Sequence, residues 1–201
     1  MRVARYVHIT SGSASVCGEP LKTTSSGLQL LSELYRSHVG DYPKFFKMDV
    51  LCKLGFIAAE LLAEGEKDRF VPREVRAVLL FSKTGPLCND LNYSATIVDD
   101  EYFPSPSLFV YTLANIVTGE ISIRNKYKGD TTAFELPGFD PQAIVDNVEA
   151  AFLDEGTDSA ICGWTECPSQ DEFEAVMMLV ERSADDHGLP FNVETLKKIR
   201  Q

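Results

Sequence analysis

Residues 107–136 read SLFVYTLANIVTGEISIRNKYKGDTTAFEL, and this stretch decides the predicted fold. Its first part, 107–125, carries apolar side chains around almost the whole helical cylinder, which predicts a helix buried on most sides. Its last part, 131–136, is typical of a strand. A helix that runs into a strand in this way indicates an α/β architecture.

Strands and helices alternate along the rest of the chain. Apolar runs of strand length occupy 5–10, 75–81 and 158–164. Helical periodicity covers 25–39, 47–64 and 193–200. Asp140 and Pro141 fit the N-cap and first turn of a further helix, whereas 83–90 is rich in turn formers and 173–181 fits either a strand or a helix. This alternation predicts a largely parallel or mixed sheet flanked by helices.

The composition is that of a globular protein. With 201 residues, of which 44% are apolar and 24% charged, we expect a single domain over 1–201. No apolar run approaches the length of a membrane span, and the N-terminus lacks a signal-peptide pattern. The five cysteines are odd in number and scattered, which indicates free thiols and no zinc site. We therefore expect a cytoplasmic protein without a metal or other cofactor.

The net charge of −11 argues against several classes of partner. Nucleic-acid binding depends on Lys and Arg side chains that neutralise phosphates, so it is disfavoured, and adhesion to anionic membranes is disfavoured for the same reason. Three basic residues lie close together in mid-chain, and we interpret them as a solvated helix end: Arg124, Lys126 and Lys128.

Common catalytic motifs are missing from the sequence. It contains no Gly-rich phosphate loop, no His-Glu-x-x-His and no Gly-x-Ser-x-Gly. The isolated histidines His8, His38 and His187 are interpreted as surface or core residues rather than catalytic ones. The acidic clusters 99–101 and 185–186 are interpreted as solvated loops.

The segment 113–124, followed by Lys128-Gly129, resembles a pattern of the β-ketoacyl synthase family. In that pattern a Pro-Asn-x-x-x-Gly-x-Ile-x-Ile helix runs into Lys-Gly-Pro and the strand that delivers the active-site cysteine. Residues 158–166 resemble the family's strand ending in Ala-Gly-Gly-x-Glu, and 46–49 resemble its Met-Asp helix entry. The resemblance implies the thiolase-type fold, in which two similar halves each contain a mixed, mostly parallel five-stranded sheet flanked by helices. The chain is as long as one half, so we expect the N-terminal half alone.

The sequence departs from the family where the nucleophile is expected. Gly138 stands at the position of the family's cysteine, and Asp140 would place a carboxylate at the start of the helix that follows. The family's catalytic histidines and lysine belong to the half that this chain lacks. The resemblance therefore implies that no catalytic residue of a 3-oxoacyl-(acyl carrier protein) synthase is present. A polar helix face, with Asp146, Asn147 and Glu149, is expected if no second half covers it.

Three functions follow from these observations. The first is a non-catalytic ketosynthase-like subunit or scaffold in fatty-acid or polyketide synthesis. It would form a homodimer, or a heterodimer with a ketosynthase, because 107–125 and 131–136 lie where the family dimerises. An acyl carrier protein is a further candidate partner, although it is itself acidic and the charge of −11 disfavours it. The alternatives are a module that binds an acyl chain or another apolar ligand, and an acyltransferase with Cys162 or Cys167 as relocated nucleophile.

Overall fold

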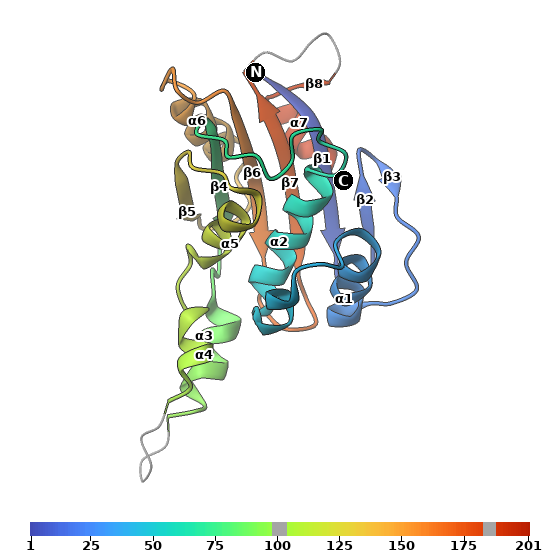
Figure 1. The fold of residues 1–201 in the computed structure, drawn as a ribbon, viewed down its shortest axis with the longest axis vertical. Coiled ribbons are helices and arrows are strands. Elements are labelled where there is room, and N and C mark those ends of the chain that lie inside the picture. Colours follow the sequence, from blue (N-terminus) through green and yellow to red (C-terminus); the bar gives the residue numbers. More distant parts are fainter. Residues whose placement is uncertain (98–103, 183–187) are drawn as a thin grey trace.

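The computed structural model describes residues 1–97, 104–182 and 188–201. The acidic clusters 99–101 and 185–186, and His187, lie outside these residues. A twisted sheet forms the centre of the molecule, with α1, α2 and α5 on one face and α6 and α7 on the other (Figure 1). The strands are β1 (Arg2–Thr10), β2 (Ala14–Val16), β3 (Glu19–Pro20), β4 (Arg76–Ser82), β5 (Thr131–Glu135), β6 (Ser159–Glu166), β7 (Glu174–Glu181) and β8 (Leu189–Pro190). The helices are α1 (Gly27–His38), η1 (Pro43–Lys47), α2 (Val50–Leu62), α3 (Leu87–Ser94), α4 (Pro106–Val110), α5 (Ile116–Asn125), α6 (Pro141–Ala151) and α7 (Val193–Arg200).

The sheet runs in the order β3-β2-β1-β7-β6-β4-β5, and β8 pairs with β1. The predicted α/β architecture with a mixed sheet is confirmed, but the described residues form eight strands rather than five. Parallel pairing joins only β4 to β5 and β4 to β6, so the expectation of mostly parallel strands needs correction. The reason is that β6–β7 and β1–β2–β3 follow one another without a crossover helix, so each connection reverses the chain direction.

The hairpin between β2 and β3 was not predicted from the sequence. Val16 lies opposite Glu19, so the connection consists of Cys17 and Gly18 alone. Both residues have positive φ, 52° and 83°, as a two-residue hairpin turn that matches the strand twist requires. Gly at the second position favours this conformation, but strands of two or three residues carry too little pattern to be recognised.

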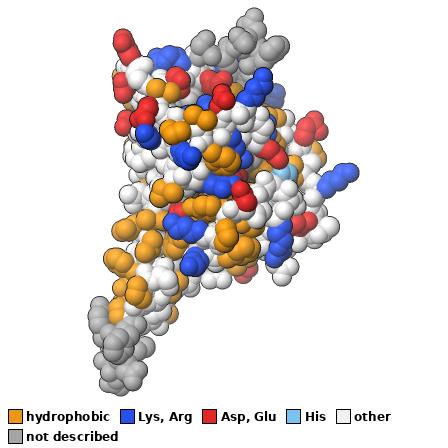
Figure 2. All heavy atoms as spheres, in the orientation of Figure 1, with side chains coloured by type: hydrophobic (Ala, Val, Ile, Leu, Met, Phe, Trp, Pro, Cys, Tyr) orange, Lys and Arg blue, Asp and Glu red, His pale blue; other side chains and the backbone are white. Residues whose placement is uncertain are grey.

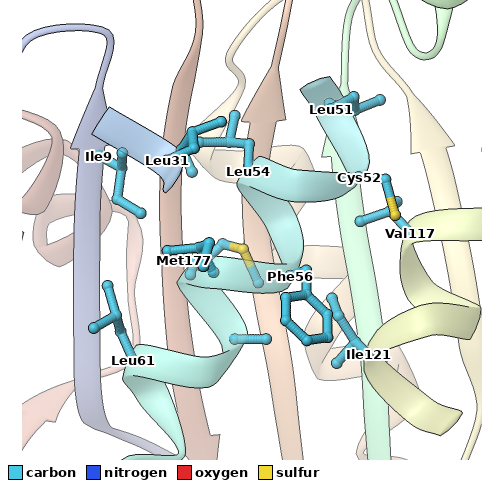
Figure 3. Packing of buried hydrophobic residues seen from close by; sticks show 14 of the residues in the cluster. Ile9, Leu31, Leu51, Cys52, Leu54, Phe56, Leu61, Val117, Ile121 and Met177 are labelled. Carbon is cyan, nitrogen blue, oxygen red and sulfur yellow. The ribbon is translucent and has the colours of Figure 1, made fainter. Parts of the chain in front are cut away.

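The helix predicted over 47–64 is confirmed as α2. The Oδ1 of Asp49 accepts the backbone N–H of Cys52 at 3.0 Å and caps its N-terminus. Leu54, Leu61 and other apolar side chains of α2 pack between the sheet, α1 and α5 (Figure 3). Gly55 lets α5 approach closely, because a Cβ there would lie 2.5 Å from a methyl carbon of Val117. The predicted start of α6 is also confirmed, since Asp140 accepts the N–H groups of residues 142 and 143.

The predictions for two segments, 107–125 and 83–90, are wrong. The segment 107–125 is not one helix, because α4 ends at Val110 and α5 begins only at Ile116. It is not buried on most sides either, since Phe109 and Ile123 are 51% and 67% exposed. The loop predicted over 83–90 contains the start of α3, whose buried Asn89 donates to the carbonyl of Leu108 and joins α3 to α4. The ambiguous run 173–181 forms strand β7.

No helix in the described part of the chain is long and apolar enough to cross a membrane. All five cysteines are free, as expected.

Candidate subunit interface

Strand β5 forms one outer edge of the sheet, with β4 as its neighbour. The N–H of Leu136, just after β5, donates to the carbonyl of Ser82 at 2.8 Å. Because backbone groups of successive strand residues point in opposite directions, the even-numbered residues of β5 bond to β4. The backbone N–H and C=O groups of the odd-numbered residues therefore point away from the sheet: Thr131, Ala133 and Glu135.

The two edges of the sheet differ in how well they are protected. β5 reads Thr-Thr-Ala-Phe-Glu and contains neither Lys nor Pro, the residues that commonly block the addition of a further strand. β3, at the opposite edge, has two residues and ends at Pro20, which has no N–H to donate. One edge is thus blocked, whereas the other can accept a strand.

Helices α3 and α4 form an arm that extends from the body of the molecule (Figure 1). We use the name for described residues 87–97 and 104–114, among which Asp90 is the single charged side chain. Large apolar side chains cover the arm (Figure 2), and the following are 43–63% exposed: Leu87, Leu91, Ile97, Phe109, Val110 and Leu113. Large apolar side chains that are exposed side by side are typical of a binding surface.

Helix α5 joins the arm to the β5 edge. It packs over β4 and β5, and its Ile123 is exposed. Strand β5, α5 and the arm lie on the same side of the molecule (Figure 1), and we call the β5 edge, Ile123 and the exposed arm residues the β5–arm surface. This surface combines unpaired backbone groups with exposed apolar side chains, which is what a protein partner can cover.

Arg124 does not belong to a solvated helix end, contrary to our interpretation of the sequence. Its guanidinium forms ion pairs with Asp41 at 2.5 Å and Glu60 at 3.4 Å, and it lies over the rings of Tyr42 and Phe70. The side chain of Arg124 is turned inward because the buried carboxylate of Glu60 requires positive partners. Lys126 and Lys128, at the same helix end, are exposed as expected.

Gly138 lies in the loop between β5 and α6. A Cβ added there would meet nothing within 4 Å, so the backbone leaves room for a side chain at this position. The next residue, Phe139, packs edge-on against Trp164 and lies under the guanidinium of Arg200. The carboxylate of Asp140 occupies the positive end of α6, where it would oppose a second anion.

The two candidate relocated nucleophiles are not placed for catalysis. Cys162 and Cys167 are fully buried, and this burial raises the pKa of both thiols well above the usual value. The thiol of Cys167 donates to the carbonyl of Ser169 at 3.1 Å. Of the described histidines, His8 pairs with Glu174, and His38 pairs with Glu64, just after α2. None of these contacts would turn a thiol into a thiolate.

The polar face predicted for α6 is present. Asp146 and Glu149 are exposed, and Asn147 is half-buried because its amide donates to the carbonyl of Ala143 at 2.8 Å. Among His, Cys, Asp and Glu side chains of the described residues, no group of three could hold a metal ion. The arm was missed at the level of the sequence, although Ser105-Pro106 fits an N-cap and a first helical residue.

The fold is similar to that of solved ketosynthase structures. The ishigamide ketosynthase/chain length factor matches with a TM-score of 0.66 and 14% identity, over 92% of this chain and 63% of that one. The ketosynthase ApeO in complex with its chain length factor ApeC, from Xenorhabdus doucetiae, matches with a TM-score of 0.57 and 11% identity. That match covers 100% of this chain and 90% of the other. AntDE:AntF, a type II polyketide synthase acyl-carrier protein in complex with its ketosynthase, matches with a TM-score of 0.61 and 13% identity, over 90% and 62%.

These similarities confirm the thiolase-like, ketosynthase-related fold. The chain spans less than two thirds of two of these relatives, 63% and 62%, and 90% of the third. No protein-family model matches the sequence, and no curated protein does.

Proposed function

We propose that the chain is a non-catalytic ketosynthase-like subunit that pairs with a ketosynthase through the β5–arm surface. It would act as a scaffold in polyketide or fatty-acid synthesis. In this proposal residues 1–201 form one domain, equivalent to the N-terminal half of the family fold, and Gly138 stands where the family has its nucleophile. Pairing with a second copy of the same chain is the alternative arrangement.

The observation that carries the proposal is the β5–arm surface. An open sheet edge binds another strand through backbone hydrogen bonds, and the apolar residues beside it add hydrophobic contact. The arm supplies this contact with side chains such as Leu91 and Phe109, which are 63% and 51% exposed in the single chain. For a protein that stays monomeric, exposing these side chains to water is unfavourable.

The pairing with a ketosynthase rests on the solved relatives. Two of them are described as a ketosynthase together with a chain length factor, so the fold occurs in paired subunits. The match that covers 90% of the related chain shows that a protein close to this one in extent has this fold within such a complex. We therefore favour the heterodimer over the homodimer.

The competing functions have less support among the described residues. An acyl-binding module needs an apolar cavity, and the apolar space between α2 and α5, lined by Cys52, Tyr111 and Val117, is about 10 Å³. A larger cavity between β1 and α7 is lined mainly by polar side chains. The space between α2 and α5 is too small to hold an acyl chain. A relocated nucleophile would need an activating base beside Cys162 or Cys167, whereas both thiols are buried and unactivated.

The test is co-purification with a ketosynthase from the same organism, followed by light scattering of the complex. Ala133→Pro removes an N–H that points away from β4 and leaves the ladder within the chain intact. Phe109→Glu places a charge in the apolar part of the surface. Both variants should abolish co-purification, and both should retain the far-UV circular dichroism of the wild type.

The matched control for Phe109→Glu is Leu153→Glu. Leu153 is 84% exposed and lies just after α6, outside the β5–arm surface. This control should bind as the wild type does. A wild-type protein that stays a 22.3 kDa monomer with no affinity for a ketosynthase would refute the proposal, as would binding that both surface variants leave unchanged.

A further inference from the structure

A second site lies far from the β5–arm surface, on the face of the sheet that carries α7. It is a cavity of about 330 Å³ between β1, the β2–β3 hairpin, β8 and α7, within the size range of small-molecule sites. Its lining residues come from both ends of the chain: Tyr6, His8, Ser15, Gly18, Leu189, Lys198, Ile199 and Gln201.

The strand pattern explains why polar groups meet here. Val7 and Ile9 point into the core under α2, so the alternating residues Tyr6 and His8 point to the α7 face. Ser15 lies directly opposite His8 on β2, and cross-strand neighbours share one face of the sheet. The cavity thus receives a phenol, an imidazole and a hydroxyl group from two adjacent strands.

The side chains that line the cavity include a positive charge and no negative one, although the whole chain carries −11. Lys198 lines it, and no Asp or Glu side chain does. The ammonium of Lys198 forms no ion pair with any described residue, in contrast to its neighbour Lys197, which pairs with Glu194 at 3.1 Å. An unpaired ammonium at the wall of a cavity can bind the oxygen atoms of an anion.

His8 is held in position by groups behind it. Its Nε2 lies 3.3 Å from Oε1 of Glu174, and Glu174 accepts two hydrogen bonds from Nε and Nη2 of Arg200, at 3.0 and 2.8 Å. The guanidinium of Arg200 balances the charge of Glu174, so this carboxylate does not cancel the positive charge of Lys198. Leu189 and Ile199 form the apolar part of the cavity wall.

We propose that this cavity binds a small organic anion. Its carboxylate or phosphate group would contact Lys198, His8 and the hydroxyl groups of Ser15 and Tyr6, and its apolar part would pack on Ile199. A preformed cavity with one apolar wall and converging donors is the usual form of such a site. The site is independent of the proposed pairing with a ketosynthase, because it lies on other elements.

The experiment is an NMR titration of the ¹⁵N-labelled chain with benzoate, with neutral benzamide of the same shape, and with phenyl phosphate. We expect benzoate or phenyl phosphate to shift the amides of residues 6, 8, 15 and 198 with saturation, and benzamide to bind at least tenfold more weakly. The anion that binds more tightly shows whether the cavity prefers a carboxylate or a phosphate group.

Two lysine variants then test which positive charge binds the anion. Lys198→Gln should weaken the binding of the anion about tenfold or more, as the loss of a charge-assisted hydrogen bond does. Lys197→Gln, one residue away on α7 and outside the cavity, should bind as the wild type. Equal binding of benzoate and benzamide, shifts confined to other elements, no saturable shift by either anion, or equal effects of the two lysine variants would overturn the proposal.

Discussion

Replacing Asp49 by Asn should make the protein more stable at neutral pH and leave its stability at low pH nearly unchanged. Asp49 caps α2, and burial raises the pKa of its carboxyl from 3.8 to about 6, against hydrogen bonds from the backbone N–H groups that lower it. The folded protein therefore binds a proton at Asp49 more tightly than the unfolded chain. Stability from this group is fully present below pH 3.8 and is lost as pH rises through 6.

The size of the effect follows from the shift in pKa. A difference of one pKa unit corresponds to about 1.36 kcal/mol, so a shift from 3.8 to about 6 corresponds to an upper limit of about 3 kcal/mol at pH 7. Partial solvent contact at the N-terminus of α2 reduces this figure, and we expect about 1–2 kcal/mol. Asn is also a good N-cap residue, so the substitution preserves the cap.

The assay is urea unfolding of the wild type and Asp49→Asn between pH 3.5 and 7.5, followed by circular dichroism. The difference in unfolding free energy, variant minus wild type, should increase across pH 4–6 and then level off. Other carboxylates titrate in both proteins and cancel in this difference. A difference that is constant with pH, or that decreases as pH rises, would refute the reasoning about burial.

Three further outcomes are expected. Leu54→Ala or Leu61→Ala should each lower the unfolding free energy by about 2–5 kcal/mol, measured by the urea midpoint, because each removes a fully buried side chain of α2. Burial alone would raise the pKa of Glu174, but hydrogen bonds from an imidazole and a guanidinium lower it to about 2. Glu174→Gln should therefore lower the unfolding free energy by about 1–2 kcal/mol at pH 7. That cost should vanish as the pH falls from 4.5 towards 2. Gly138→Cys should release no carbon dioxide from a malonyl-thioester with an acyl-thioester acceptor, because a thiol beside Asp140 is not activated; turnover by this variant alone would show otherwise.

Much of the fold could be predicted because its central elements are rich in apolar residues over the length of a strand or a helix. Local sequence patterns were enough to predict the apolar residues of α2, the strands β4 and β6, and the N-cap at Asp140. The short strands β2 and β8 could not, since pairing with β1 rather than their own composition defines them.

The β5–arm surface was harder to predict for a different reason. Exposed apolar residues have the same composition as apolar residues that contact the core, so 107–125 was predicted to be buried on most sides. The structure separates the two groups, with Tyr111 and Val117 inside and Phe109 and Ile123 outside. The cavity beside α7 could not be predicted either, because it joins Ser15 to Lys198 across almost the whole sequence.

The unequal edges of the sheet also limit how many subunits can join. Head-to-tail addition, in which β5 of each copy pairs with β3 of the next, would produce an open fibre without a defined end. A two-residue β3 that ends at Pro20 is a poor receiving strand, so head-to-tail addition at this edge is disfavoured. Contact between two β5-type edges, by contrast, uses both open edges at once and leaves none free. In the proposed pairing through β5, the proline at the end of β3 would therefore favour pairs over longer assemblies.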